Sequence, residues 1–166
     1  MVDTEQYVSR LKSYVEGHDP LAMQESAPLI LAKLIEGVPE DRLRLPPAPG
    51  KWSVGEILAH LADDEIVTFW RYRQMIENDG CGLAGFDQDE WARVGANSSA
   101  NPRQALQLFQ LLRESNLRML RNLTPEEWQR RGIHAERGGT SVQDLARYMA
   151  GHDANHIEQI RRILGK

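Results

Sequence analysis

Two histidines four positions apart near the end of the chain have the clearest potential for chemistry. His152 and His156 stand in the stretch GHDANHIEQI. On a helix, residues i and i+4 lie one turn apart on one face, so two such imidazoles can hold one metal ion. Leu145, Met149 and Ile160 continue the same spacing, which predicts that both histidines face the core. A buried pair satisfied by carbonyls or carboxylates remains the alternative, because buried polar groups need partners.

Two ligands do not make a metal site, so a third must come from elsewhere in the chain. His60 is the best candidate, since it stands in EILAHLADDE on the flank of another apolar helix face. Three histidines that leave one position open are typical of catalytic metal sites. Asp64 follows His60 at i+4 and could be a fourth ligand, orient an imidazole or act as a general base.

For the remaining residues with potential for chemistry, we expect exposed, capping or structural roles. His18 lies in a connector and His134 in a loop, so we expect exposed or capping positions for both. Cys81 is the single cysteine, which excludes a disulfide framework and a cysteine-rich zinc site. No base stands beside it to activate a catalytic thiol. Trp91 lies in a long stretch without a helical or strand period, and we expect this stretch to lie near the site. Asp87, in the same stretch, is expected to be a helix N-cap.

Composition narrows the class of protein. The chain has 166 residues, of which 41% are hydrophobic and 27% are charged, as expected for one soluble domain spanning residues 1–166. A net charge of −4 without a basic stripe argues against nucleic-acid binding. No apolar run approaches the roughly 18 residues of a membrane span, and the N-terminus lacks a signal-peptide core. We therefore expect a cytoplasmic protein without membrane association.

The elements that must position these residues are helices separated by connectors that contain glycine and proline. Apolar spacing and caps predict helices over 4–16, 19–37, 53–78, 101–122 and 141–164, with a short helix from 124. S/T-x-x-D/E capping boxes open the helices at Ser53, Thr124 and Ser141, and Pro28 kinks or restarts the second segment. No alternating run predicts a strand. The sequence predicts an all-α four-helix bundle with short extra helices.

Three stretches together resemble one known family. KWSVGEILAHLADDE, GFDQDEWA and GHDANHIEQIRRIL are similar, in their order and spacing, to the DinB-like (YfiT-like) metalloenzymes. The resemblance runs from about Leu45 to Leu164. It implies a four-helix bundle with a long crossover connection, a homodimer, and a divalent ion, most often zinc or nickel, on His60, His152 and His156.

The resemblance also implies a choice of reactions. Family members include transferases and isomerases that use bacillithiol, mycothiol or glutathione, and others are named metal-dependent hydrolases. We expect a metal-dependent thiol S-transferase acting on a small-molecule substrate, with the low-molecular-weight thiol as cosubstrate and Asp64 as the catalytic residue. The alternatives are a hydrolase that uses a metal-activated water and a non-catalytic dimeric metal-binding module. Phe69, Tyr72 and Leu117 are the expected contributors to a dimer interface.

Overall fold

The computed structural model describes residues 4–134 and 138–166, which are mostly helical. None of the helices described is long and apolar enough to span a membrane. The elements follow in this order: α1 (Thr4–Val15), α2 (Pro20–Ile35), α3 (Glu40–Arg44), α4 (Val54–Glu77), β1 (Cys81–Leu83), α5 (Gln88–Val94), the 3-10 turn η1 (Asn97–Ser99), α6 (Pro102–Leu120), α7 (Pro125–Gln129), β2 (Arg131–His134), β3 (Gly138–Ser141) and α8 (Val142–Leu164).

The helices begin where their capping residues predict. Ser53, Thr124 and Ser141 each form a complete capping box, in which the side chain accepts from the third helical N–H and the acidic residue there accepts from the cap N–H. Asp19 caps α2, where a proline occupies the first helical position. Pro28 lies within α2, which continues past it to Ile35, so the helix does not restart there.

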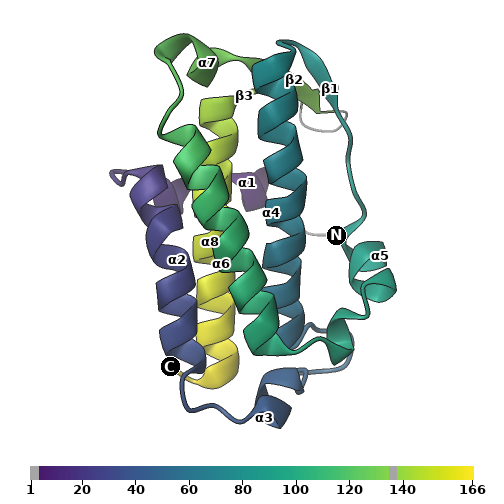
Figure 1. Cartoon of the computed structure of the whole chain (residues 1–166). Helices are drawn as coiled ribbons and strands as arrows, with labels where there is room; N and C mark the ends of the chain where they lie inside the picture. The colour runs from purple at the N-terminus through teal and green to yellow at the C-terminus, as the bar shows by residue number, and fades with distance from the viewer. Residues whose placement is uncertain (1–3, 135–137) are drawn as a thin grey trace.

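Four long helices, α2, α4, α6 and α8, form the bundle (Figure 1). α2 and α8 run in one direction and α4 and α6 in the other. Because α4 and α6 start at the same end, the chain between them must return along the length of the bundle, and it does so through β1, α5 and η1. This return is the long crossover connection that the family resemblance implies.

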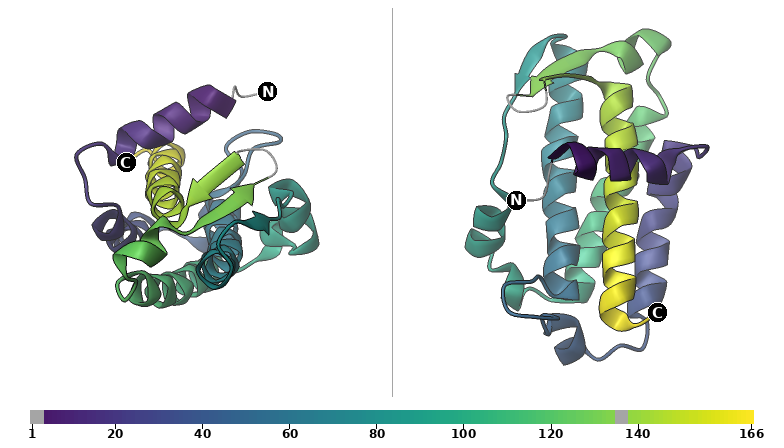
Figure 2. Two further views of the ribbon diagram at one scale, coloured as in Figure 1. Left: turned by 90° about the horizontal axis from the view of Figure 1, so that it is seen from above. Right: turned by 180° about the vertical axis from the view of Figure 1, so that it is seen from behind.

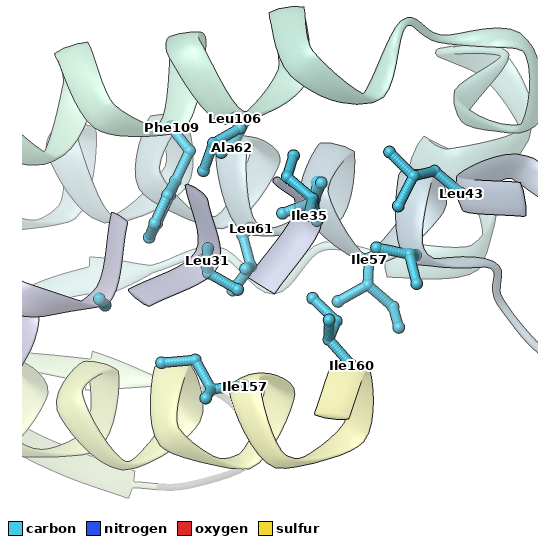
Figure 3. Packing of buried hydrophobic residues seen from close by; sticks show 13 residues of the cluster. Leu31, Ile35, Leu43, Ile57, Leu61, Ala62, Leu106, Phe109, Ile157 and Ile160 are labelled. Carbon is cyan, nitrogen blue, oxygen red and sulfur yellow. The ribbon is translucent and has the colours of Figure 1, made fainter. Parts of the chain in front are cut away.

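Apolar side chains from all four bundle helices form the main core (Figure 3). The fully buried members include Leu31 of α2, Ile57 of α4, Phe109 of α6 and Ile160 of α8. Leu43 of the short helix α3 closes the same cluster. A second apolar cluster lies around Tyr72, Leu120 and Leu145. The two apolar clusters hold the bundle helices in fixed positions.

Helix α1 crosses α8 instead of joining the bundle (Figure 2). The crossing is close at Gly151, where an added Cβ would overlap the carbonyl oxygen of Leu11. Leu11 and Val15 bury their side chains at this contact. Only glycine permits two helix backbones to approach this closely, so Gly151 fixes where α1 crosses.

The expectation of no strand is wrong. β1 pairs with β2 in parallel and β2 with β3 antiparallel, which makes a three-stranded sheet at one end of the bundle. The strands have only 3 or 4 residues, too few for a period of two to show in the sequence. Gly132 of β2 lies against Leu83 of β1, whose side chain occupies the space that a Cβ would need.

Three side chains differ in burial from the expectation. His134 is buried at the end of β2, not exposed. Tyr72 and Leu117 are buried in the chain's own interior, so neither can contribute to a dimer interface.

Candidate metal centre

Three histidines from two helices converge inside the bundle. His60 comes from α4, and His152 and His156 come from successive turns of α8. All three side chains are buried, and one nitrogen from each lies within 4.8 Å of the others. A search of the described part of the chain for three or more histidine, cysteine, aspartate or glutamate side chains close enough to hold a metal ion finds these three histidines. The structure therefore brings together the three residues that spacing indicated.

The separations between the ring nitrogens fit one small ion. Nε2 of His152 lies 3.4 Å from Nε2 of His60 and 3.1 Å from Nε2 of His156. Nitrogens that each lie about 2 Å from a tetrahedral zinc ion are separated by roughly 3.3 Å. The rings meet at steep angles of 61° and 70°, so their nitrogens, rather than their faces, point toward a common position.

The protonation states also suit metal binding. Burial, followed by the proximity of His156, lowers the pKa of His60 to about 3. Burial lowers the pKa of His156 to about 4, although a hydrogen bond with Gln159 acts in the opposite direction. Both imidazoles are therefore neutral at pH 7 and keep a lone pair for a cation.

Gln159 fixes which nitrogen of His156 is available. Nδ1 of His156 lies 3.0 Å from the amide oxygen of Gln159. An amide oxygen only accepts, so Nδ1 carries the proton and Nε2 presents its lone pair to the cluster. Trp52 packs its ring 4.8 Å from the ring of His60 and closes the cluster on that side. Sequence reasoning missed Gln159, although its i+3 position from His156 was available as a signal.

Asp64 lies beside the three histidines. Its Oδ2 atom is 3.1 Å from Nε2 of His152 and 3.4 Å from Nε2 of His60. Burial raises the pKa of Asp64 to about 7; Glu65 and Asp153 add to this rise and Arg71 opposes it. A carboxyl group that titrates near neutral pH, next to a cluster of metal-ligating nitrogens, is suited to taking and returning a proton.

A cavity of about 970 Å³ lies between α1, the sheet and the first turns of α8. Tyr148 and Arg71 form part of its wall and also border the cluster: Tyr148 stacks on His152 with ring centroids 6.2 Å apart, and the charge of Arg71 acts on Asp64. The lining also holds Lys12 and Arg147 together with two carboxylates, Glu16 and Asp144. The three histidines and Asp64 are not part of this lining, so the cavity neighbours the cluster through Tyr148 and Arg71.

The other sequence candidates lie apart from this centre. Cys81 is half-buried on β1, and burial raises the pKa of its thiol. His18 is exposed at the rim of the cavity. Asp87 caps α5, as expected, and Trp91 of α5 packs on Phe86. No contact between Trp91 and the three histidines is found among the described residues.

Comparison with known proteins identifies relatives of this chain. The family model of the DinB superfamily matches residues 25–160. YfiT of Bacillus subtilis, whose name describes it as a candidate metal-dependent hydrolase, is 25% identical over 145 residues, which cover 85% of this chain and 82% of that protein. A protein of Oceanobacillus iheyensis with the same description is 24% identical, with coverage of 84% and 80%.

Two solved structures share the fold. YfiT from Bacillus subtilis superimposes with a TM-score of 0.80 and 21% identity, covering 99% of this chain and 91% of that one. A mycothiol-dependent maleylpyruvate isomerase superimposes with a TM-score of 0.68 and 11% identity, covering 85% of this chain and 59% of that one. At these identities the likeness establishes the four-helix architecture and leaves the chemistry to the residues of the site.

Proposed function

This chain belongs to the DinB superfamily, and on that basis we propose that it is a metal-dependent S-transferase, which joins a low-molecular-weight thiol to an electrophilic small molecule. His60, His152 and His156 hold a divalent ion. Three imidazoles suit zinc, nickel, cobalt, copper or iron, and zinc or nickel is the choice that the family resemblance implies. A divalent ion held there lowers the pKa of a bound thiol or water, so that the nucleophile is available at neutral pH.

In this proposal Asp64 accepts the proton of the thiol and later releases it to solvent. Its carboxylate lies within 3.4 Å of two of the metal-ligating nitrogens, so it is in reach of a nucleophile bound at the cluster. With a chloro-dinitrobenzene substrate, the thiol proton passes to Asp64, a carbon–sulfur bond forms, the carbon–chlorine bond breaks and chloride leaves. Asp64 then returns the proton to solvent, and the net products are a thioether and hydrogen chloride.

The mycothiol-dependent isomerase that shares the fold supports a thiol-dependent reaction, and the neighbouring cavity has room for two reactants. At about 970 Å³ it lies at the upper end of the range for small-molecule sites, roughly 300–1,000 Å³. A transferase must hold a thiol and an electrophile together, whereas a hydrolase needs room for one substrate and a water. The described part of the chain offers no cysteine at the centre, since Cys81 lies on β1, so the thiol comes with a cosubstrate.

Hydrolysis is the second candidate, favoured by the description of YfiT as a candidate metal-dependent hydrolase. The same three histidines and Asp64 would then activate water and not a thiol. The two reactions differ in one requirement that can be measured directly, because hydrolysis consumes no thiol.

The deciding experiment uses zinc- or nickel-loaded protein with glutathione, mycothiol or bacillithiol and 1-chloro-2,4-dinitrobenzene. We expect metal-dependent thioether formation that His156→Ala abolishes. A panel of esters and amides is run in parallel with and without thiol. Turnover of an ester without thiol, together with no thioether from any of the three thiols, would replace the transferase by the hydrolase.

A further inference from the structure

One buried arginine connects all four helices of the bundle. Arg113 of α6 is 1% exposed. Its Nη1 atom donates to Oδ2 of Asp153 on α8 at 2.6 Å and to the carbonyl oxygen of Gln24 on α2 at 2.9 Å. Its Nη2 atom donates to Oε1 of Glu65 on α4 at 2.8 Å and to Oδ1 of Asp153 at 3.1 Å.

Two amides complete this network. Nδ2 of Asn116 donates to the second carboxylate oxygen of Glu65 at 2.8 Å, and Nε2 of Gln24 donates to the carbonyl oxygen of Ala146 at 2.8 Å. We call Arg113, Glu65, Asp153, Asn116 and Gln24 the interior clamp. Glu65 and Asp153 are 1% and 2% exposed, so both carboxylates depend on Arg113 for their compensating charge.

A buried ion pair of this kind is a poor source of net stability. Removing charges from water costs about as much as their attraction returns, and apolar side chains of similar volume often serve the fold equally well. What such a pair does provide is geometry, because a planar guanidinium bonds carboxylates in a fixed fork. The clamp therefore defines the positions of α4 and α8 more than it stabilises the bundle.

Each clamp carboxylate directly follows a residue of the candidate metal centre. Glu65 follows Asp64 on α4, and Asp153 follows His152 on α8. Consecutive residues of a helix are about 1.5 Å apart along the axis and point about 100° apart. The clamp and the metal centre are thus on adjacent faces of the same turns of both helices.

The packing of the helices gives this adjacency a consequence. α4 packs most extensively on α6, and α8 on α1 and α2, while the contact between α4 and α8 is smaller. The metal centre spans that smaller contact, because His60 belongs to α4 and the other two histidines to α8. The relative position of the ligands therefore depends on a third helix, and Arg113 is the side chain of α6 that bonds both.

We propose that Arg113 is a positioning residue for the metal centre: by holding Glu65 and Asp153 together, it sets the separation of His60 from His152 and His156. The inference rests on the three-histidine site proposed above. Arg113 touches neither the metal nor the substrate in this role. It acts through the backbone of α4 and α8, so its loss changes the affinity and geometry of metal binding even where the fold survives.

The test uses a neutral clamp, Arg113→Met combined with Glu65→Gln and Asp153→Asn, because Arg113→Met alone leaves two buried carboxylates without a cation and can unfold the chain. Circular dichroism and thermal melting first establish that the triple variant folds. Zinc affinity is then measured by competition with a chromophoric chelator, and coordination geometry by the visible spectrum of the cobalt-loaded protein. We expect zinc affinity to fall about 10- to 100-fold and the intense tetrahedral cobalt bands to weaken.

Three further proteins make the outcome decisive. Leu106→Ala lowers stability in the core of α6 without touching the clamp, and it should keep wild-type affinity and cobalt spectrum. Arg113→Lys, which keeps the charge but loses the fork, should fall between wild type and the triple variant. His156→Ala reports the site itself: if wild type and His156→Ala bind zinc equally, the proposed function fails. If wild type binds zinc tightly and a folded triple variant matches it in affinity and spectrum, the positioning role is overturned.

Discussion

Nε2 of His60 lies 3.4 Å from Nε2 of His152, although 92 residues separate the two in the chain. The first belongs to the helix that precedes the crossover connection and the second to the last helix. Their encounter requires the whole bundle topology, since α4 and α8 run in opposite directions (Figure 1) and the second turn of α4 meets the middle of α8.

Metal content should depend on each of the three histidines. Replacing His60, His152 or His156 by alanine removes one of three neutral nitrogen ligands, and two ligands hold a divalent ion weakly. We expect elemental analysis to find about one metal ion per wild-type chain and a small fraction of that in each variant. His134→Ala is the matched control, because His134 is also buried but lies on β2. Equal metal content in wild type and His156→Ala would refute the site.

Ionisation of Asp64 should lower the free energy of unfolding of the metal-free protein as the pH rises. Its pKa is about 7 in the fold against 3.8 in the unfolded chain, so between these values the unfolded state releases its proton first and gains free energy relative to the fold. The cost is absent below about pH 4 and complete above about pH 7, where it reaches at most about 4 kcal/mol. We expect Asp64→Asn to be more stable than wild type at pH 8, with the difference vanishing near pH 4.

Urea denaturation of the metal-free proteins across this pH range checks the effect. Asp89→Asn, at an exposed position on α5, serves as the control and should follow the wild-type pH profile. A difference between Asp64→Asn and wild type that does not change between pH 4 and pH 8 would show that Asp64 titrates as an ordinary surface carboxylate.

The sequence predicts much of this site and little of what surrounds it, for physical reasons. His152 and His156 are recognisable because the helical period places them in line with Leu145 and Met149, and that period is local information. The interior clamp is not recognisable, since Arg113 and Glu65 read as ordinary charged helix residues until tertiary packing brings them together. The strands were missed because three or four residues carry no period. The N-cap positions were predicted correctly because a capping box is complete within four residues.

Gly151→Ala should displace α1 and damage the cavity. The new methyl group would overlap the carbonyl oxygen of Leu11, and a helix backbone cannot move aside as a side chain can. Overpacking of this kind costs about 1–3 kcal/mol, which denaturant unfolding can measure. Because α1 forms one wall of the cavity, we also expect KM for the electrophile to rise in the thiol-transfer assay. Gly85→Ala, where a Cβ meets no neighbour, should leave both quantities unchanged.

Removal of metal should lower the melting temperature without unfolding the protein. Two apolar clusters bury side chains from all four bundle helices independently of the histidines, so the core suffices for folding. A metal ion at 100 times its Kd adds about 2.7 kcal/mol. We expect EDTA to shift the thermal midpoint downward with an unchanged helical circular dichroism spectrum at 25 °C. Complete loss of that spectrum on chelation would instead assign the metal a structural role.

Cys81→Ser should leave thiol transfer intact. Burial raises the pKa of the Cys81 thiol, so little thiolate forms near neutral pH, and the thiolate is the nucleophile. The residue lies on β1, paired with Gly132, and no contact with the three histidines is found in the described part of the chain. We expect kcat and KM for the added thiol to match wild type in the chloro-dinitrobenzene assay. A variant that lost activity while still binding zinc would mean that Cys81 displaces chloride from the electrophile first and that the cosubstrate thiol then takes the dinitrophenyl group from the Cys81 sulfur.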